Sequence, residues 1–227
     1  DDENKVVIGA ALDAPVPVPM TGALYMSDVT GGQKTGMYFE QRPNHEYAAG
    51  MARDGEVLDV FSQVAGFSLA ALAGGAARAH AVDGSAPALV LAQMGAEKMG
   101  MADRFQTTQG DAFEVLEALV QQGASFDLVV CDPPAFAPSK PALAAGLRAY
   151  ERVARLAAGL VRPGGYLGLC SCSHAAALAA FRGASIRGRG RAGRRSALIH
   201  TGFAGPDHPQ MPALAESGYL KSLFFRL

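Results

Sequence analysis

The stretch that decides the fold is Val57-Leu-Asp-Val-Phe-Ser-Gln-Val-Ala-Gly-Phe-Ser68, in which an apolar run is followed by a glycine. The run Val57–Phe61 predicts a strand, Gly66 predicts a turn, and residues 68–73 predict the start of a helix. The strand is apolar almost throughout, as expected for a strand buried on both faces. This pattern indicates a parallel sheet that is covered by helices.

The same unit repeats toward the C-terminus. Further strands are predicted at residues 78–83, 104–108, 126–131 and 166–170, and near 197–203 and 219–226. Helices are predicted between the earlier strands, at residues 85–100, 112–122 and 142–160. We therefore expect an α/β fold with seven strands, most of them parallel, and helices on both faces of the sheet.

The N-terminal segment, residues 1–30, is predicted to be an extension and could be the remnant of a preceding domain. Proline alternates in Ala14-Pro-Val-Pro-Val-Pro19, so this part should be extended and unable to pair as a central strand. Gly31–Arg42 predicts a glycine-rich turn that leads into a short strand, and His45–Met51 predicts a helix. The chain begins with acidic and polar residues, without Met or a secretory leader, so we expect sequence upstream of it.

The composition limits the classes of protein that the chain can represent. It has 227 residues, of which 49% are hydrophobic and 18% charged, enough for the core of one large domain. The formal net charge of −1 argues against coating nucleic acid by bulk charge, and no apolar run approaches the roughly 20 residues of a membrane span. The three cysteines are not a disulfide framework and indicate a cytoplasmic protein. The Arg182–Arg195 stretch is interpreted as a solvated surface rather than an RNA-contact patch.

Acidic residues stand at the ends of four successive predicted strands. In an open parallel sheet, ligands bind beyond the carboxyl ends of the strands. Asp83 is placed to accept hydrogen bonds from ribose hydroxyls, and Asp111 from an exocyclic adenine amine. Each of these acids could instead cap the helix that follows, but four in a row are hard to attribute to capping alone. The members are Asp59, Asp83, Asp111 and Asp132.

Five segments together resemble the class I methyltransferases that use S-adenosylmethionine (SAM), and more narrowly the bacterial large-subunit rRNA cytosine-5 methyltransferase family. The segments are residues 32–42, 57–68, 132–136, 170–174 and 216–221. The resemblance implies a Rossmann-like methyltransferase domain over residues 31–227, with an antiparallel C-terminal strand. It also implies a small RNA-binding PUA domain upstream, an rRNA partner, and no metal. It leaves the oligomeric state open, with a homodimer among the alternatives.

The resemblance assigns roles to individual positions of this chain. Cys172 would be the nucleophile, Asp132 would face both base and cofactor, and the element Phe39-Glu-Gln41 would close over SAM. The substrate base would contact Pro133, Pro134 and Phe136. The expected SAM ligands are Phe39, Gln41, Asp59, Ser62, Gly66, Asp83, Asp111 and Asp132. Two positions depart from the family pattern: Ala65 replaces a more usual glycine, and Pro134 stands where many RNA cytosine-5 enzymes have a cysteine.

The expected chemistry is covalent. A thiolate that adds to C6 of cytosine makes C5 nucleophilic enough to accept a methyl group, and a base then removes the C5 proton. The target base must be single-stranded or flipped out of its helix. His174 is an alternative base but is more simply a loop residue, and Cys131 is expected in the core. Two other functions remain open: a purine-nitrogen (guanine) RNA methyltransferase without covalent catalysis, and a non-catalytic RNA-binding module with the same fold.

Overall fold

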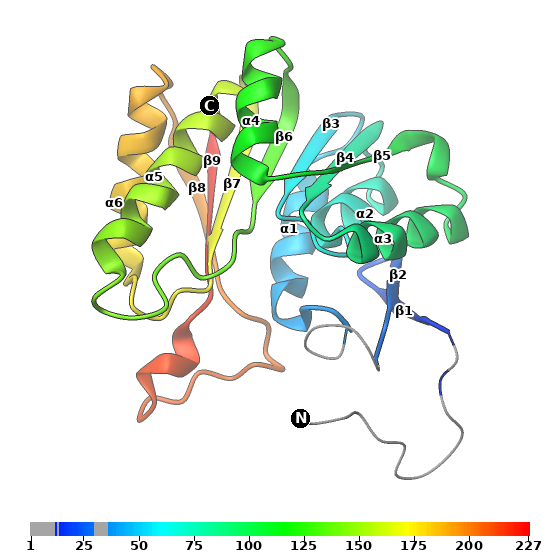
Figure 1. The fold of residues 1–227 in the computed structure, drawn as a ribbon, viewed down its shortest axis with the longest axis horizontal. Helices are drawn as coiled ribbons and strands as arrows, with labels where there is room; N and C mark the ends of the chain where they lie inside the picture. Colours follow the sequence, from blue (N-terminus) through cyan, green and yellow to red (C-terminus); the bar gives the residue numbers. More distant parts are fainter. Residues whose placement is uncertain (1–11, 13, 30–35) are drawn as a thin grey trace.

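The computed structural model describes residues 12, 14–29 and 36–227. In this part of the chain, the main sheet has seven strands in the spatial order β5-β4-β3-β6-β7-β9-β8 (Figure 1). Its last strand in sequence, β9, runs antiparallel to both β7 and β8, and the remaining pairs are parallel. The predicted seven-stranded, mostly parallel sheet is therefore confirmed. The strands are β3 (Glu56–Val60), β4 (Arg78–Asp83), β5 (Phe105–Gln109), β6 (Phe126–Cys131), β7 (Val161–Ser171), β8 (Ala197–Gly202) and β9 (Lys221–Arg226).

Helices cover both faces of this sheet, as expected from strands that are apolar on both sides. One hydrophobic cluster joins one face to the first three helices, and a second cluster joins the other face to the last three. The helices of the first layer are α1 (Arg42–Met51), α2 (Gly66–Ala73) and α3 (Ala86–Lys98). Those of the second layer are α4 (Ala112–Gln121), α5 (Leu143–Gly159) and α6 (Leu178–Arg191). None of the helices in the described residues is long and apolar enough to cross a membrane.

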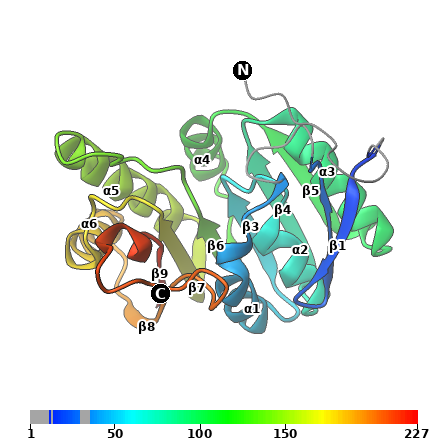
Figure 2. The same ribbon diagram turned by 90° about the horizontal axis from the view of Figure 1, so that it is seen from below.

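The order in which the chain adds strands reverses between β3 and β6. The chain builds outward from β3 through β4 to β5, and then returns to place β6 on the other side of β3. The crossover connections therefore diverge at the carboxyl ends of these two central strands, which is where open α/β sheets form ligand clefts. Figure 2 views the molecule from this edge.

A separate hairpin precedes the main sheet. Within the described residues, its strands β1 (Val16–Met20) and β2 (Ala23–Ser27) pair only with each other, as the alternating prolines predict. The hairpin lies on α2 and α3, and Tyr25 is fully buried there, with its hydroxyl donating to the Gly66 carbonyl over 3.2 Å. The domain boundary near residue 30 stays a prediction, but the hairpin contributes to the core of the sheet domain.

Two local predictions are wrong. The expected short strand before α1 is a turn of 3-10 helix at Phe39–Gln41, because Pro43 starts α1 three residues earlier than expected. Residues 31–35 of the predicted glycine-rich turn lie outside the described residues. The fifth strand begins at Val161 rather than Tyr166, so that Pro163–Gly165 lies inside β7. The register shift between β6 and β7 accommodates this extra segment.

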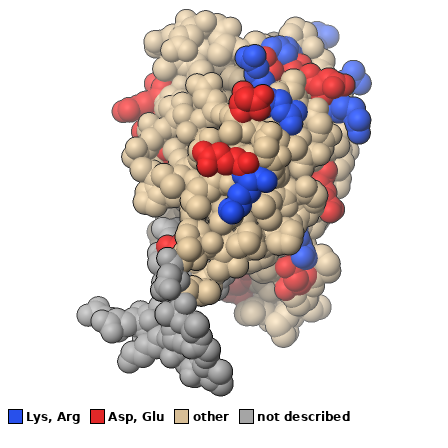
Figure 3. Space-filling model, turned by 90° about the vertical axis from the view of Figure 1, so that its right-hand side faces the viewer, with Lys and Arg blue, Asp and Glu red and all other residues tan. Residues whose placement is uncertain are grey.

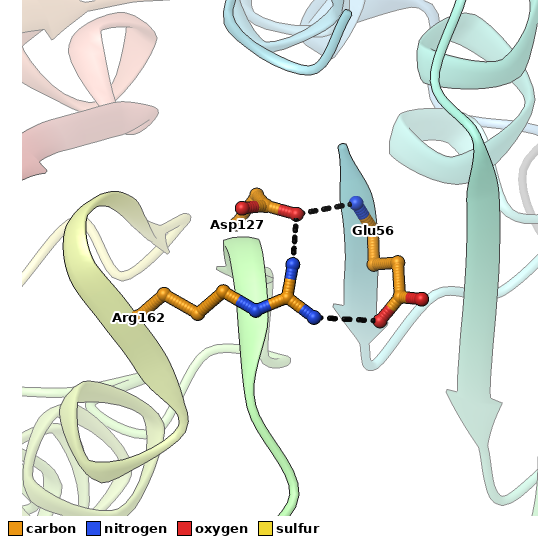
Figure 4. Close-up of polar contacts among 3 residues, drawn as sticks. All are labelled: Glu56, Asp127 and Arg162. Carbon is orange, nitrogen blue, oxygen red and sulfur yellow. Dashed lines mark hydrogen bonds and ion pairs between the residues drawn. The ribbon is translucent and has the colours of Figure 1, made fainter. Parts of the chain in front are cut away.

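The amino end of the sheet, away from the cleft, carries ion pairs. Arg162 donates to Asp127 and to Glu56, and Asp127 also accepts from the Glu56 backbone N–H (Figure 4). These side chains are more than a third exposed, so each pair contributes at most about 1 kcal/mol. The contacts join β3, β6 and β7 at the edge opposite the cleft.

Several arginines of the segment 182–195 bind other parts of the chain rather than only solvent. Arg187 and Arg191 both pair with Glu151 of α5, and Arg194 donates to the carbonyls of Ala158 and Val161. Elsewhere, acidic and basic side chains are interspersed on the face drawn in Figure 3, in keeping with a formal net charge of −1.

Candidate functional site

A cavity of about 550 Å³ opens at the carboxyl ends of β3, β4, β6 and β7. This size is typical of a small-molecule site. Most of the predicted site residues line it, although they come from segments far apart in the sequence. They are Gln41, Asp59, Ser62, Gly66, Asp83, Asp132, Pro133, Pro134 and Cys172. After the roles expected from the sequence, we call the part formed by residues 59–66 and 83–91 the cofactor half, and the part formed by residues 132–134 and 172 the target half.

The cofactor half contains a strained loop. Phe61, Gln63 and Ala65 all have positive φ, at 61°, 49° and 61°. The left-handed conformation is strained for residues that carry a Cβ. Non-glycine residues that adopt it cluster at functional sites. Asp83 holds this loop, because its carboxylate accepts from the Gln63 N–H over 2.7 Å and from the Ser85 N–H over 2.8 Å. Ala65, which replaces the glycine more usual in the family that the sequence resembles, thus lies at a position where glycine would be less strained.

Asp59 is completely buried at the floor of the cofactor half. Its Oδ2 accepts from the Ser68 N–H over 2.9 Å and from the Ser68 hydroxyl over 3.1 Å. Its Oδ1 and the Ser62 hydroxyl have no hydrogen-bond partner within the described parts of the chain. Burial raises the pKa of the Asp59 carboxyl to about 7. A cationic or hydroxyl-bearing ligand would satisfy these open polar atoms.

Gly66 opens α2 at a point of close approach to α1. A Cβ added to Gly66 would lie 2.5 Å from Cε1 of His45, so no larger residue fits without movement. His45 is buried among Tyr25, Phe67 and the cavity wall, and burial lowers its pKa to about 3. The ring is therefore neutral at neutral pH. No pattern in the sequence marks His45 as a site residue, since it reaches the cavity through the packing of α1 against α2.

The target half places Asp132 opposite Gln41. The Gln41 side-chain amide donates to the Asp132 carboxylate over 2.9 Å, and its own oxygen accepts from Asn44 over 2.7 Å. The Asp132 N–H donates to the Val60 carbonyl over 3.1 Å, which anchors the loop after β6 to the end of β3. Gln41, at the end of the 3-10 turn that precedes α1, thus holds the carboxylate of Asp132 in place.

Cys172 follows directly after the end of β7. It is partly exposed and lines the cavity, and its Sγ lies 3.9 Å from the Pro133 carbonyl oxygen. The other two cysteines are buried, Cys131 in one core cluster and Cys170 in the other, and burial raises both of their pKa values. Of the three thiols, only Cys172 meets the cavity.

The residues on either side of Cys172 belong to a buried hydrogen-bond network. The Ser171 hydroxyl donates to the Tyr150 hydroxyl over 2.9 Å, and the Ser173 hydroxyl lies 2.7 Å from the same tyrosine oxygen. The Ser173 hydroxyl also accepts from the Ala137 N–H over 3.0 Å, which ties it to the loop after Asp132. The network therefore fixes the loops that carry Cys172 and Asp132 relative to each other.

Three predicted site residues do not line the cavity. Phe39 packs against the hydrophobic cluster of the first helix layer, and Phe136 packs against Phe61, Phe113 and Tyr150. Asp111 is exposed and caps α4, because its Oδ1 accepts from the backbone N–H groups of residues 113 and 114. Its strand, β5, is at the edge of the sheet, on the far side of β4 from the two central strands β3 and β6. The alternative base His174 is exposed and also lies outside the lining residues.

Glu40 is a buried lining residue that was not among the predicted site residues. Tyr219 donates from its hydroxyl to Glu40 Oε1 over 3.0 Å, and burial raises the tyrosine pKa. The neighbouring Leu220 also lines the cavity. The segment before β9 therefore closes one side of the site.

Known proteins resemble this chain along nearly all its length. The sequence profile described as S-adenosylmethionine-dependent methyltransferase matches residues 9–226. A ribosomal RNA large subunit methyltransferase I from Aeromonas salmonicida is 34% identical, over 99% of this chain and 57% of its own. One from Vibrio vulnificus is 36% identical, over 97% of this chain and 56% of its own. The chain thus spans just over half the length of these relatives.

Solved structures show the same fold at low sequence identity. A methyltransferase crystallised with SAH superposes with a TM-score of 0.86 at 20% identity, over 97% of this chain and 58% of the other. A SAM-dependent methyltransferase from Streptococcus mutans gives 0.84 at 21% identity, over 97% and 57%.

Proposed function

The chain belongs to the S-adenosylmethionine-dependent methyltransferase family, and from this premise we propose that it methylates C5 of a cytosine in large-subunit rRNA, with Cys172 as the nucleophile. The relatives' names support an rRNA substrate. The observation that carries the covalent mechanism is the position of Cys172. It is the one cysteine in the cavity, and it stands beside the loop that carries Asp132.

The cofactor half fits SAM. When bound, SAM supplies an electrophilic methyl group on a positively charged sulfur. The open Oδ1 of Asp59 and the open Ser62 hydroxyl would receive the amino acid part, which carries an ammonium group. Asp83 would accept from the ribose hydroxyls, while its two backbone bonds keep its carboxylate in place.

The target half supplies the groups that act on the base. As a thiolate, Cys172 Sγ would form a bond to C6 of cytosine, and the electron pair of the C5–C6 bond would become available at C5. C5 would then take the methyl group as the bond between that methyl and the cofactor sulfur breaks, which leaves S-adenosylhomocysteine. Loss of the C5 proton to a base then restores the double bond and breaks the bond between sulfur and C6. Asp132, held by Gln41, would hydrogen-bond the base's polar edge and stabilise the adduct. Pro133 and Pro134 would contact the ring.

A mechanism-based trap tests this proposal. Large-subunit rRNA is transcribed in vitro with 5-fluorocytidine in place of cytidine, so that it carries no cellular methylation. It is incubated with the chain and SAM, and covalent adducts are resolved on a denaturing gel. Fluorine cannot leave C5 as a proton, so the wild-type chain and Cys170→Ser should form a stable adduct. Cys172→Ser should form none. An adduct with Cys172→Ser would reassign the nucleophile, and methylation of guanine without any adduct would support the purine-nitrogen alternative.

A further inference from the structure

Lys221 lies beside the strand end that carries Cys172. It is the first residue of β9 and pairs in register with Ser171. Its side chain is only 4% exposed, and its Nζ donates to the carbonyls of Ser173 over 2.7 Å and Ala176 over 2.8 Å. The Ser173 carbonyl also accepts from the Ala176 N–H over 3.2 Å. The lysine ammonium therefore closes the turn that directly follows Cys172.

No carboxylate of the described residues balances the charge of this buried ammonium. None of the ion pairs between described residues includes Lys221. Burial lowers the pKa of Lys221 to about 8, and the Cys172 thiolate acts in the opposite direction. Such an interaction is mutual, because a thiolate that favours the ammonium is itself favoured by it.

The other polar groups near Cys172 in the described part of the chain do not supply a buried positive charge. Asp132, on the same cavity wall, is an acid and would oppose a thiolate. Tyr150 of α5 and Tyr219 before β9 have raised pKa values through burial and are neutral at neutral pH. His174, in the same turn, is exposed to solvent. Among the residues that the structure describes, Lys221 is thus the buried cation next to the turn that follows Cys172.

We propose that Lys221 is a positioning residue for the nucleophile. It holds the turn at residues 173–176 through two hydrogen bonds, and its positive charge favours the thiolate form of Cys172. The inference rests on the proposed role of Cys172, because a nucleophilic thiol needs help to ionise near neutral pH. Lys221 does not line the cavity and acts through Cys172 alone.

The pH dependence of Cys172 alkylation tests the inference without RNA or methyl transfer. The full 227-residue chain is treated with iodoacetamide from pH 6 to pH 10, and modification of Cys172 is followed by peptide mass spectrometry. The midpoint reports the thiolate, and the plateau at high pH reports access. Lys221→Met should raise the midpoint by about one unit and lower the rate at pH 7 roughly tenfold.

Three further variants separate charge from hydrogen bonding. Lys221→Gln keeps donors but loses the charge, so its midpoint should rise as in Lys221→Met. Lys221→Arg should remain near wild type. Lys98→Met removes an exposed lysine at the end of α3 and should change nothing. Circular dichroism and SAM calorimetry check that each variant is folded.

Two results would overturn the inference. One is an unchanged midpoint in folded Lys221→Met or Lys221→Gln, with only the plateau altered, since that would leave Lys221 a purely structural role. The other is a wild-type midpoint at or above that of a free cysteine, about 8.5, which needs no variant to fold. Because neither measurement involves RNA, both are distinct from failure of the adduct trap.

Discussion

The two halves of the cavity differ in how their polar groups are satisfied. In the cofactor half, the Asp59 Oδ1 and the Ser62 hydroxyl are buried without partners in the described structure. In the target half, Gln41 binds Asp132, and the serines beside Cys172 are bonded to Tyr150. An unsatisfied buried polar group costs about 1–3 kcal/mol, which a ligand can recover. The cofactor half is therefore built to be completed by a ligand, whereas the target half is already organised around its thiol.

The largest expected effect comes from a substitution in the target half, which should abolish methyl transfer and leave SAM binding intact. Cys172→Ser should reduce methyl transfer to rRNA at least about a thousandfold, as expected for loss of a nucleophile. Its affinity for SAM should stay within about twofold, since the cofactor half keeps all its contacts. Transfer of tritium from labelled SAM and calorimetry measure the two effects. Cys170→Ser is the matched control and should keep substantial activity. A large loss of SAM affinity in Cys172→Ser would show that the halves are coupled.

The next largest effect comes from a substitution in the cofactor half, which should weaken SAM binding. Asp83→Ala should weaken SAM binding at least about tenfold, since charge-assisted hydrogen bonds contribute roughly 1.5–3 kcal/mol. Asp111→Ala is the matched control: it removes the cap of α4 at a cost of about 1 kcal/mol of stability but should leave SAM affinity unchanged. Calorimetry and thermal unfolding separate the two. Equal losses of affinity would return Asp111 to the site, as the sequence alone predicts.

A third prediction concerns Asp59 of the cofactor half and His45, which lines the cavity beside it, because the two groups have opposite pKa shifts. The His45 pKa is lowered to about 3, so its contribution to stability is complete above pH 6.5 and is lost as the pH falls toward 3. The Asp59 pKa is raised to about 7, so its contribution is complete below pH 3.8 and is lost as the pH rises through 7. Between pH 6.5 and pH 5 the two contributions should nearly cancel.

Single substitutions should expose each contribution. On acidification from pH 6.5 to pH 5, His45→Phe should gain up to about 2 kcal/mol of unfolding free energy relative to wild type, and Asp59→Asn should lose a similar amount. Urea unfolding at the two pH values measures both. Parallel pH profiles for all three proteins would mean that neither group has its shifted pKa.

The smallest effect concerns the strained loop. Ala65→Gly should change the unfolding free energy by less than about 1 kcal/mol, because relief of the left-handed conformation is offset by the lost methyl group and a more flexible unfolded chain. Ala71→Gly, a buried helical control in α2, should cost at least about 1 kcal/mol. Thermal unfolding compares the pair. A cost as large at residue 65 would mean that the positive φ stores no strain.

Much of the fold was predictable because the signals are local. β4 and β6 match their predicted ranges, and most other elements differ by one or two residues, since an apolar run bounded by a turn is visible in the chain itself. The strand before α1 failed because its residues are neither regularly alternating nor apolar, and Pro43 decided where the helix begins.

The sequence by itself determined that acids and a cysteine stand at the ends of strands, because strand ends are set by nearest neighbours along the chain. Only the tertiary structure decided which of them meet. Asp83 and Asp111 look alike in sequence, yet the order of the strands brings Asp83 to the cavity and leaves Asp111 at the sheet's edge. His45 of α1 lines the cavity beside Gly66, and Lys221 of β9 holds the turn after Cys172, although each is distant in sequence from the residues it contacts. Such contacts depend on packing between distant segments, and no local pattern records them.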